Sequence, residues 1–274
     1  MKLLKILPLL LTFSCIDMLT EETTHYNSIY FEGGSWIEID RMDNMRLDPQ
    51  SNEFTLQFWV SGSDVYANEG PAFFSLIDPQ GTVKLALFRD SGNTARITTI
   101  VNSSTIHRES SVLDWSNSDT FYLLSILFSN SRGIRVMIND ESQPILEDPS
   151  NLVDVSDTKL MFGTNANANR LPLENFWYGY FDEIRLWNSM LTDSTIKFQY
   201  EHPDKFSEHY RYTELDDNGE IVKRQTYLDS LIGIWRFNVS EPTAIIEDQS
   251  GYGHNGSLYA KPNFSVTFSE KGVQ

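Results

Sequence analysis

Two aspartates stand where a carboxylate needs a specific partner. Asp182 interrupts the apolar side of an alternating segment, and an unpaired buried carboxylate is expensive. A metal ion, a cation or backbone N–H groups must therefore meet it. Asp248 begins the segment DQSGYGHNG, whose glycines at positions 251, 253 and 256 allow the positive φ angles that turn carbonyl oxygens inward.

Carbonyl oxygens combined with one or two carboxylates are the ligands that calcium prefers. The pattern therefore predicts a structural calcium ion held by Asp248 and Asp182, with Glu32 or a carbonyl beside it as a further ligand. The alternative is that both aspartates only accept hydrogen bonds from nearby backbone N–H groups. The residues alone leave both interpretations open.

The tryptophans suggest a second kind of chemistry. Trp36, Trp115 and Trp177 fall near expected turns or strand ends, where an exposed indole ring can stack against the face of a sugar. The alternative for these three residues is partial burial in the core. The other tryptophans lie within expected strands, where packing is the usual role.

Other common catalytic or metal patterns are absent from the sequence. The five histidines are scattered without an i, i+4 pair, so a histidine metal site is not expected. There is also no phosphate-binding loop, zinc-type spacing or dinucleotide fingerprint. The candidate functional groups are therefore carboxylates and aromatic rings, and the fold must bring them together.

The segment from 178 to 191, YGYFDEIRLWNSML, predicts the strand that carries Asp182. Its residues alternate, with Tyr180, Ile184 and Leu186 beside Asp182 on one face. Glu183 and Arg185 fall on the other face, where we expect a solvated pair. A short helix should follow over 192–200, because Thr192 or Asp193 can cap it and Pro203 stops it.

The rest of the chain consists mostly of alternating apolar segments separated by glycine-rich or polar turns, which predicts further strands. They cover residues 28–32, 35–40, 54–61, 72–77, 83–89, 94–101, 121–128, 133–139 and 159–163. Residues 203–230 are polar around Asp216-Asp217-Asn218-Gly219 and predict an inserted hairpin.

Composition narrows the class of protein. The 274 residues, 40% of them hydrophobic, can bury one substantial core, so we expect one domain over 28–274. The net charge of −17 argues against binding to nucleic acid or to an anionic bilayer. It suits calcium binding or simple solubility.

The first residues have the layout of an export signal. Residues 1–15, MKLLKILPLLLTFSC, place two lysines before an apolar run that is too short to span a bilayer. Cys15, the only cysteine, resembles the lipidated residue of a bacterial lipobox. We expect a lipoprotein anchored to the bacterial cell envelope, with residues 16–27 as a polar tether.

Several of these segments resemble laminin-G-like modules of the concanavalin A-like lectin/glucanase superfamily. The likeness rests on GYFDEIRLWN at 179–188, on FTLQFWV at 54–60 and on the pair at 121–139. It implies an all-β jelly-roll sandwich of two antiparallel sheets with one short helix. It also implies a non-catalytic module that binds a glycan or an extracellular protein, and calcium is common in such modules.

The C-terminal segment carries a second likeness to the same modules. Residues 231–259 resemble a family segment that usually stands before the first strand, with Asp248, Ser250, Gly251, Gly253 and Gly256 in register. Either 231–274 opens a second copy, or it supplies the missing strands of the same sandwich in a permuted order. We favour permutation, because some forty residues cannot bury a core alone.

Two other functions remain as alternatives. Glu38, Asp40 and Asp43 resemble the E-x-D-x-x-E motif of laminarinase-type glucanases, which implies glycoside hydrolysis through paired carboxylates. An envelope adhesion or structural protein without a small ligand is the third interpretation.

Overall fold

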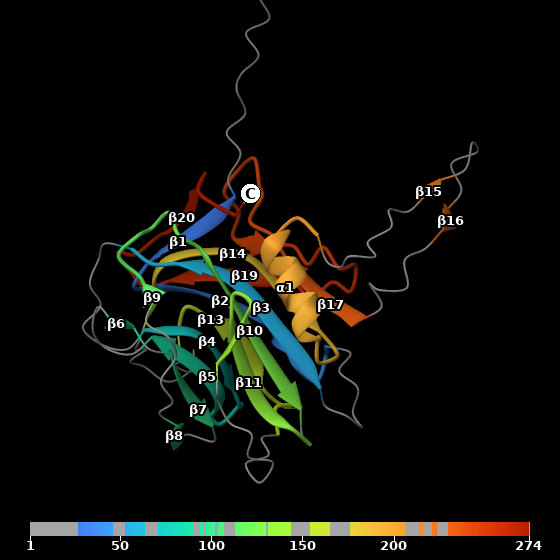
Figure 1. Cartoon of the computed structure of the whole chain (residues 1–274). Coiled ribbons are helices and arrows are strands. Elements are labelled where there is room, and N and C mark those ends of the chain that lie inside the picture. The colour runs from blue at the N-terminus through green and yellow to red at the C-terminus, as the bar shows by residue number, and fades with distance from the viewer. Residues whose placement is uncertain are drawn as a thin grey trace, which may run out of the picture.

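Two antiparallel β-sheets form the body of the protein (Figure 1). The computed structural model describes residues 27–45, 53–63, 71–89, 94–95, 97–101, 104–106, 113–129, 131–143, 154–164, 176–205, 214–215, 221–223 and 230–273. Residues 1–26, with the expected signal segment, Cys15 and most of the tether, lie outside the described residues.

The first sheet has eight described strands, and one of them is the predicted strand that carries Asp182. Its order is β12-β11-β10-β3-β14-β1-β20, and β17 also pairs with β14. Their bounds are β12 Glu141–Gln143, β11 Gly133–Ile138, β10 Tyr122–Ser129, β3 Phe54–Ser61, β14 Tyr178–Trp187, β1 Ser28–Glu32, β20 Val266–Ser269 and β17 Leu231–Trp235.

The second sheet also has eight strands, in the order β18-β19-β2-β13-β4-β5-β7-β8. Their bounds are β18 Ile245–Ile246, β19 Gly256–Ala260, β2 Ser35–Arg41, β13 Lys159–Phe162, β4 Ala72–Ile77, β5 Val83–Arg89, β7 Ile97–Val101 and β8 Ser104–Ile106. Two small pairs lie outside these sheets: β6 (Thr94–Ala95) with β9 (Leu113–Asp114), and β15 (Glu214–Leu215) with β16 (Ile221–Lys223).

The strands from 231 onward are distributed over both sheets. β17 pairs with β14 and β20 pairs with β1 in the first sheet, whereas β19 pairs with β2 in the second. Figure 1 shows β20, in red, beside β1, in blue. Residues far apart in sequence therefore meet in both layers.

The core between the sheets is rich in aromatic rings. Phe58 of β3 lies 5.4 Å from Phe162 and 5.6 Å from Phe181, measured between ring centroids. All three side chains are fully buried. The alternation in FTLQFWVS explains why Phe58 points inward, whereas its neighbour Trp59 points to the outer face.

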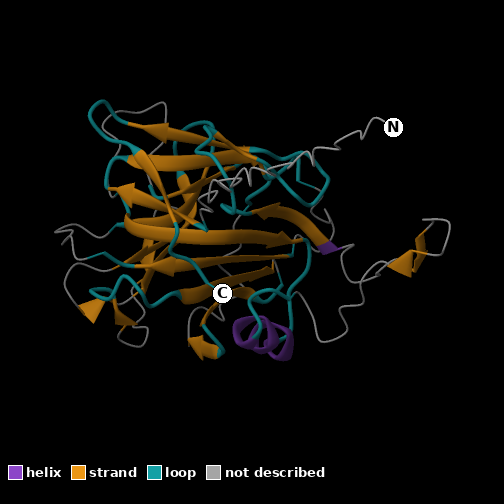
Figure 2. Cartoon of the chain, turned by 90° about the horizontal axis from the view of Figure 1, so that it is seen from above, coloured by secondary structure: helices purple, strands orange, loops and turns teal. Residues whose placement is uncertain are grey.

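Helix α1 (Asp193–Glu201) covers the outer face of the first sheet, as Figure 2 shows from above. Thr192 caps it by accepting a hydrogen bond from the Thr195 amide. Ile196 packs against a cluster of sheet residues that contains Trp59, Leu123, Leu127 and Met137. Among the described residues, no helix is long and apolar enough to cross a membrane.

The all-β sandwich is confirmed, with one helix among the described residues. The strands expected at 28–32, 54–61, 72–77 and 83–89 match β1, β3, β4 and β5. The expected strand at 94–101 is divided into β6 and β7, which pair with different partners. The short strands β8, β12, β18 and β20 were not predicted, because two to four residues carry too little alternation.

A bulge in β14 changes which side of the sheet its side chains lie on, compared with the prediction. Phe181 and Ile184 both lie in the core, although strict alternation places them on opposite faces. The register with β3 shifts between Asp182 and Ile184, and the bulged Glu183 has a φ of 27°. The extra residue reverses the first half of the strand, so the expected inward facing of Tyr180 and Asp182 is wrong.

Candidate functional site

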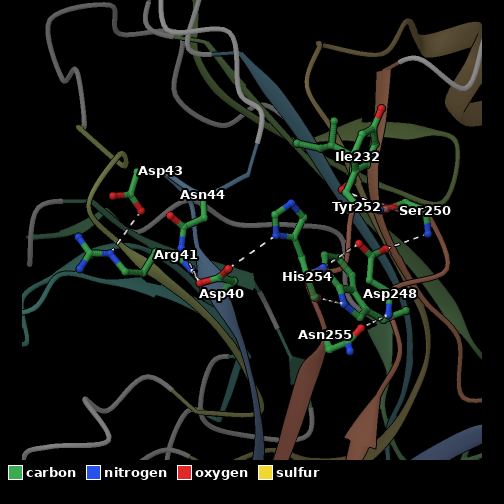
Figure 3. Close-up of polar contacts among 11 residues, drawn as sticks. Asp40, Arg41, Asp43, Asn44, Ile232, Asp248, Ser250, Tyr252, His254 and Asn255 are labelled. Atoms are coloured by element: carbon green, nitrogen blue, oxygen red, sulfur yellow. Dashed lines mark hydrogen bonds and ion pairs between the residues drawn. The ribbon is translucent and has the colours of Figure 1, made fainter.

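Asp248 organises the glycine-rich loop that precedes β19. Its Oδ1 accepts hydrogen bonds from the amides of Ile234 (3.0 Å) and Ser250 (2.9 Å), and its Oδ2 accepts one from the amide of His254 (3.1 Å). Burial raises the pKa of Asp248, but a hydrogen bond from the Ser250 side chain and those from the three amides outweigh it and hold the pKa below its usual range. Figure 3 shows the carboxylate between Ser250 and His254.

Two glycines give this loop its shape. Gly251 and Gly253 have φ angles of 88° and 83°, which other residues rarely adopt. The loop is fastened to β17, because the Trp235 indole N–H donates to the carbonyl of His254 at 2.6 Å. The predicted positive φ angles are therefore present at 251 and 253, and the loop docks on the sandwich.

The three predicted calcium ligands do not form one site. Asp182 accepts the amides of Glu183 (2.7 Å) and Val273 (2.9 Å), so both its oxygens already have donors. Glu32 is exposed and accepts only a long contact from the Ser265 hydroxyl, at 3.4 Å. Across the described ranges, no three His, Cys, Asp or Glu side chains gather so that they could hold a metal ion.

Within the described residues, Asp248, Asp182 and Glu32 are therefore not gathered into one ligand set, and the two aspartates accept backbone N–H groups. The alternative, in which both aspartates accept backbone N–H groups, fits the observed contacts. The calcium ion itself stays a prediction.

Asp182 is the most perturbed acid of the described residues. It is 4% exposed, and burial raises its pKa to about 7 in spite of the hydrogen bond from Val273. The neighbouring negative charge of Glu183 raises it further. Asp182 can therefore change its charge near neutral pH.

Trp115 and Trp177 are core residues, which corrects their assignment as sugar platforms. Their exposed fractions are 1% and 0%, and both rings pack against Phe73 with centroid distances of 5.3 and 4.5 Å. Neighbouring backbone also packs closely on Trp115, because a Cβ at Gly62 would lie 1.9 Å from the Trp115 carbonyl oxygen.

Trp36 belongs to a different environment, on the outer face of the second sheet. Its ring stacks on Tyr259, which is directly opposite on β19, with centroids 5.4 Å apart and planes 16° from parallel. Trp36 is 8% exposed, whereas Tyr259 is 44% exposed. Tyr259 is therefore the ring that a ligand can reach, and Trp36 supports it from behind.

Polar and charged groups surround this stacked pair. The Trp36 indole donates to Glu38 Oε1 at 3.0 Å, and Lys159 Nζ donates to Glu38 Oε2 at 2.8 Å. Phe176 lies 6.1 Å from Trp36, and Lys261 Nζ sits 4.3 Å above the Phe176 ring. We call these six residues the outer-face platform: Trp36, Glu38, Lys159, Phe176, Tyr259 and Lys261.

The carboxylates of the hydrolase alternative lie along the same strand. Asp40 follows Glu38 on the outer face of β2, and Asp43 lies in the turn after it, where it accepts from Arg41 Nε at 3.3 Å. Figure 3 shows the His254 ring directed toward Asp40, with Nδ1 and Oδ2 separated by 3.7 Å.

These contacts do not resemble an acid/base pair. Burial raises the pKa of Asp40, but hydrogen bonds from the Arg41 amide and the Asn44 side chain, with the nearby His254, bring the pKa below its usual range. Both oxygens of Glu38 have partners already. A general acid needs a raised pKa, and Asp40 has the opposite shift.

Four members of the outer-face platform were not identified from the sequence: Lys159, Phe176, Tyr259 and Lys261. Tyr259 faces Trp36 only because β19 pairs with β2 in this register. The family-like segment at 231–259 ends on Tyr259. If that segment is assumed to pair with the strand at 35–40, Tyr259 becomes a candidate neighbour of Trp36.

Comparisons with known proteins extend these observations. A protein-family profile described as the concanavalin A-like lectin/glucanases superfamily matches residues 31–197. Curated proteins include no match to this sequence.

Solved structures share the fold. One is a protein of Bacteroides ovatus ATCC 8483 proposed to bind carbohydrate, with 12% identity and a TM-score of 0.57 over 91% of this chain. This chain spans 62% of that protein's length. Another is the heptameric SAP-like pentraxin of Limulus polyphemus, with 11% identity and a TM-score of 0.51, covering 90% of this chain and 98% of the pentraxin.

Proposed function

Because the chain belongs to the concanavalin A-like lectin/glucanases superfamily, we propose that it is a non-catalytic carbohydrate-binding module whose ligand stacks on Tyr259. The observation that carries this proposal is the exposed Tyr259 ring held parallel to Trp36 on the outer face of the second sheet.

The chemistry of the outer-face platform suits a sugar. The C–H face of a pyranose packs on an aromatic ring, and its hydroxyl groups bond to charged side chains at the edge. Glu38 and Lys159 supply an acceptor and a donor beside the rings, and Lys261 adds a cation. The support from Trp36 fixes the orientation of Tyr259, so little side-chain entropy is lost on binding.

A glycan array followed by calorimetry tests the proposal. Tyr259→Ala should weaken binding of an array hit by about tenfold or more, whereas Tyr259→Phe should retain it. Tyr30→Ala is the matched control, because the Tyr30 ring packs against Tyr180 in the first sheet with centroids 4.8 Å apart and planes tilted by 45°. An array without hits, or an array on which every hit binds Tyr259→Ala and the native protein equally, would refute the proposal.

The hydrolase alternative rests on one observation, namely that Glu38 lies within the outer-face platform. If it is correct, the protein releases reducing sugar from a β-glucan and Glu38→Gln abolishes the release. The bonds from Trp36 and Lys159 to Glu38, and the pairing of Asp43 with Arg41, favour a binding role instead. An adhesion or structural role predicts a protein partner in a pull-down and no bound glycan.

The proposal includes an envelope location, supported by the signal-like residues 1–15 and by Cys15. In a bacterial host, the native chain should incorporate a labelled fatty acid and sediment with membranes. Cys15→Ser should do neither. Equal labelling of both proteins would contradict lipidation at this residue.

A further inference from the structure

A hollow opens on the outer face of the first sheet, where two strands meet end to end. β14 pairs with β3 along one edge from Tyr180 to Trp187. Along its other edge, β1 pairs with residues 178–181 and β17 pairs with residues 184–187. None of the described strands pairs with Asp182 or Glu183 on that edge, and a cavity of about 460 Å³ lies there.

The cavity has a fixed polar wall. Glu183 accepts from Arg185 Nε and, at 2.7 Å, from Arg236 Nε. The Arg185 side chain is 1% exposed and also donates to the carbonyl of Pro203 at 2.6 Å, so the expected solvated pair with Glu183 is wrong. These bonds hold the Glu183 and Arg236 side chains in place before any ligand arrives.

The floor and the rim differ in character. Asp182 and Trp59, each 4% exposed, form the floor. Asn238 and Gln249 are exposed and lie on the rim. The volume falls within the range of roughly 300–1,000 Å³ that is usual for small-molecule sites.

The side chains that line the cavity indicate which class of ligand fits it. Glu183 is paired with both Arg185 and Arg236, so these charges offset one another and the wall offers no strong excess charge to a phosphate, a sulfate or an amine. The amides of Asn238 and Gln249 each offer both donors and an acceptor. A hydroxyl group likewise donates and accepts, so a neutral ligand with several hydroxyl groups matches the lining.

We propose that this hollow binds a monosaccharide-sized ligand through its hydroxyl groups, as a site separate from the outer-face platform. The two sites lie on different sheets and share no residue. Failure of one proposal therefore leaves the other standing. A free monosaccharide and the terminal sugar of a longer glycan present the same hydroxyl groups, so either could be the ligand.

Saturation-transfer NMR with the full chain tests the site. The probes are glucose, galactose, mannose and N-acetylglucosamine, each as a free sugar and as the terminal unit of a disaccharide. We expect at least one probe to bind the native protein and Tyr259→Ala alike, and its affinity to fall about tenfold or more in Gln249→Ala and Asn238→Ala. Gln80→Ala is the matched control, because Gln80 is an exposed glutamine in the turn between β4 and β5.

The outcomes separate the possibilities. A free sugar that binds identifies a monosaccharide site, and binding of the disaccharide alone identifies a site for a glycan end. Binding of methylammonium or phosphate in place of every sugar would overturn the proposal. Loss of sugar binding in Tyr259→Ala with full retention in Gln249→Ala and Asn238→Ala would assign the sugar to the platform and would also overturn it.

Discussion

The carboxylate of Asp182 accepts the backbone amide of Val273 at 2.9 Å, a contact between residues 91 positions apart. It fastens the segment after β20 across the bulge of β14. A carboxyl group that is buried, perturbed in pKa and used as a tie between distant segments should make stability depend on pH.

The contribution of Asp182 to the free energy of unfolding should decrease as the pH rises from about 4 to about 7. Its pKa is raised to about 7 in the folded protein, above the ordinary value of 3.8 expected after unfolding. Between these values the folded state keeps a proton that the unfolded state has released. The contribution is complete below the unfolded pKa and is lost as pH rises through the folded pKa, by about 4 kcal/mol at most.

Urea unfolding of the native protein and Asp182→Asn at several pH values measures this effect. Asparagine cannot titrate, so the stability of the variant relative to the native protein should increase steadily between about pH 4 and pH 7. A constant difference over that range would show that Asp182 keeps an ordinary pKa.

Asp248→Ala should destabilise the protein by about 2–4 kcal/mol, because three backbone N–H groups lose their acceptor. The loss should be the same with calcium and with a chelator. Thermal melts of the native protein, of Asp248→Ala and of the exposed control Glu247→Ala measure it. A calcium-dependent rise of Tm that disappears in Asp248→Ala would instead identify a metal ligand.

Trp177→Ala should cost about 3–5 kcal/mol of unfolding free energy, because its buried ring contacts Phe73, Trp115 and Phe181. Glycan affinity should not change at temperatures where the variant is folded. Trp36→Ala should instead weaken glycan binding and cost less unfolding free energy than Trp177→Ala. Denaturation and calorimetry on both variants compare these effects, and lost binding by folded Trp177→Ala would contradict the assignment.

A chain without residues 231–274 should not fold, because both sheets lose strands next to β14, β1 and β2. A chain without the hairpin 214–223 is the control, since β15 and β16 pair only with each other among the described strands. Circular dichroism and melting curves distinguish the two. A truncated protein that melts like the native one would show 231–274 to be an appendage.

The alternation of apolar residues and the family-like motifs were sufficient to predict the sandwich, the helix and most long strands. They were not sufficient at Asp182, because no sequence signal marked a bulge and a glutamate rarely adopts the φ of 27° seen at Glu183. One extra residue there changes which side chains face the core.

The candidate site was less predictable than the fold, because it depends on pairing between distant strands. Trp36 was identified from its position near a turn, but Tyr259 becomes its partner only through the register of β19 with β2. The same criterion failed for Trp115 and Trp177, because proximity to a turn does not reveal whether the turn folds over the core.

The placement of the last strands also has a consequence for biosynthesis. Asn27 donates to the carbonyl of Glu270 across 243 residues, and β1 lies between β14 and β20. During translation, one edge of β1 and one edge of β2 must wait for β20 and β19, which are synthesised much later. Until then these edges are open to pairing with other chains, so we expect this fold to be completed slowly.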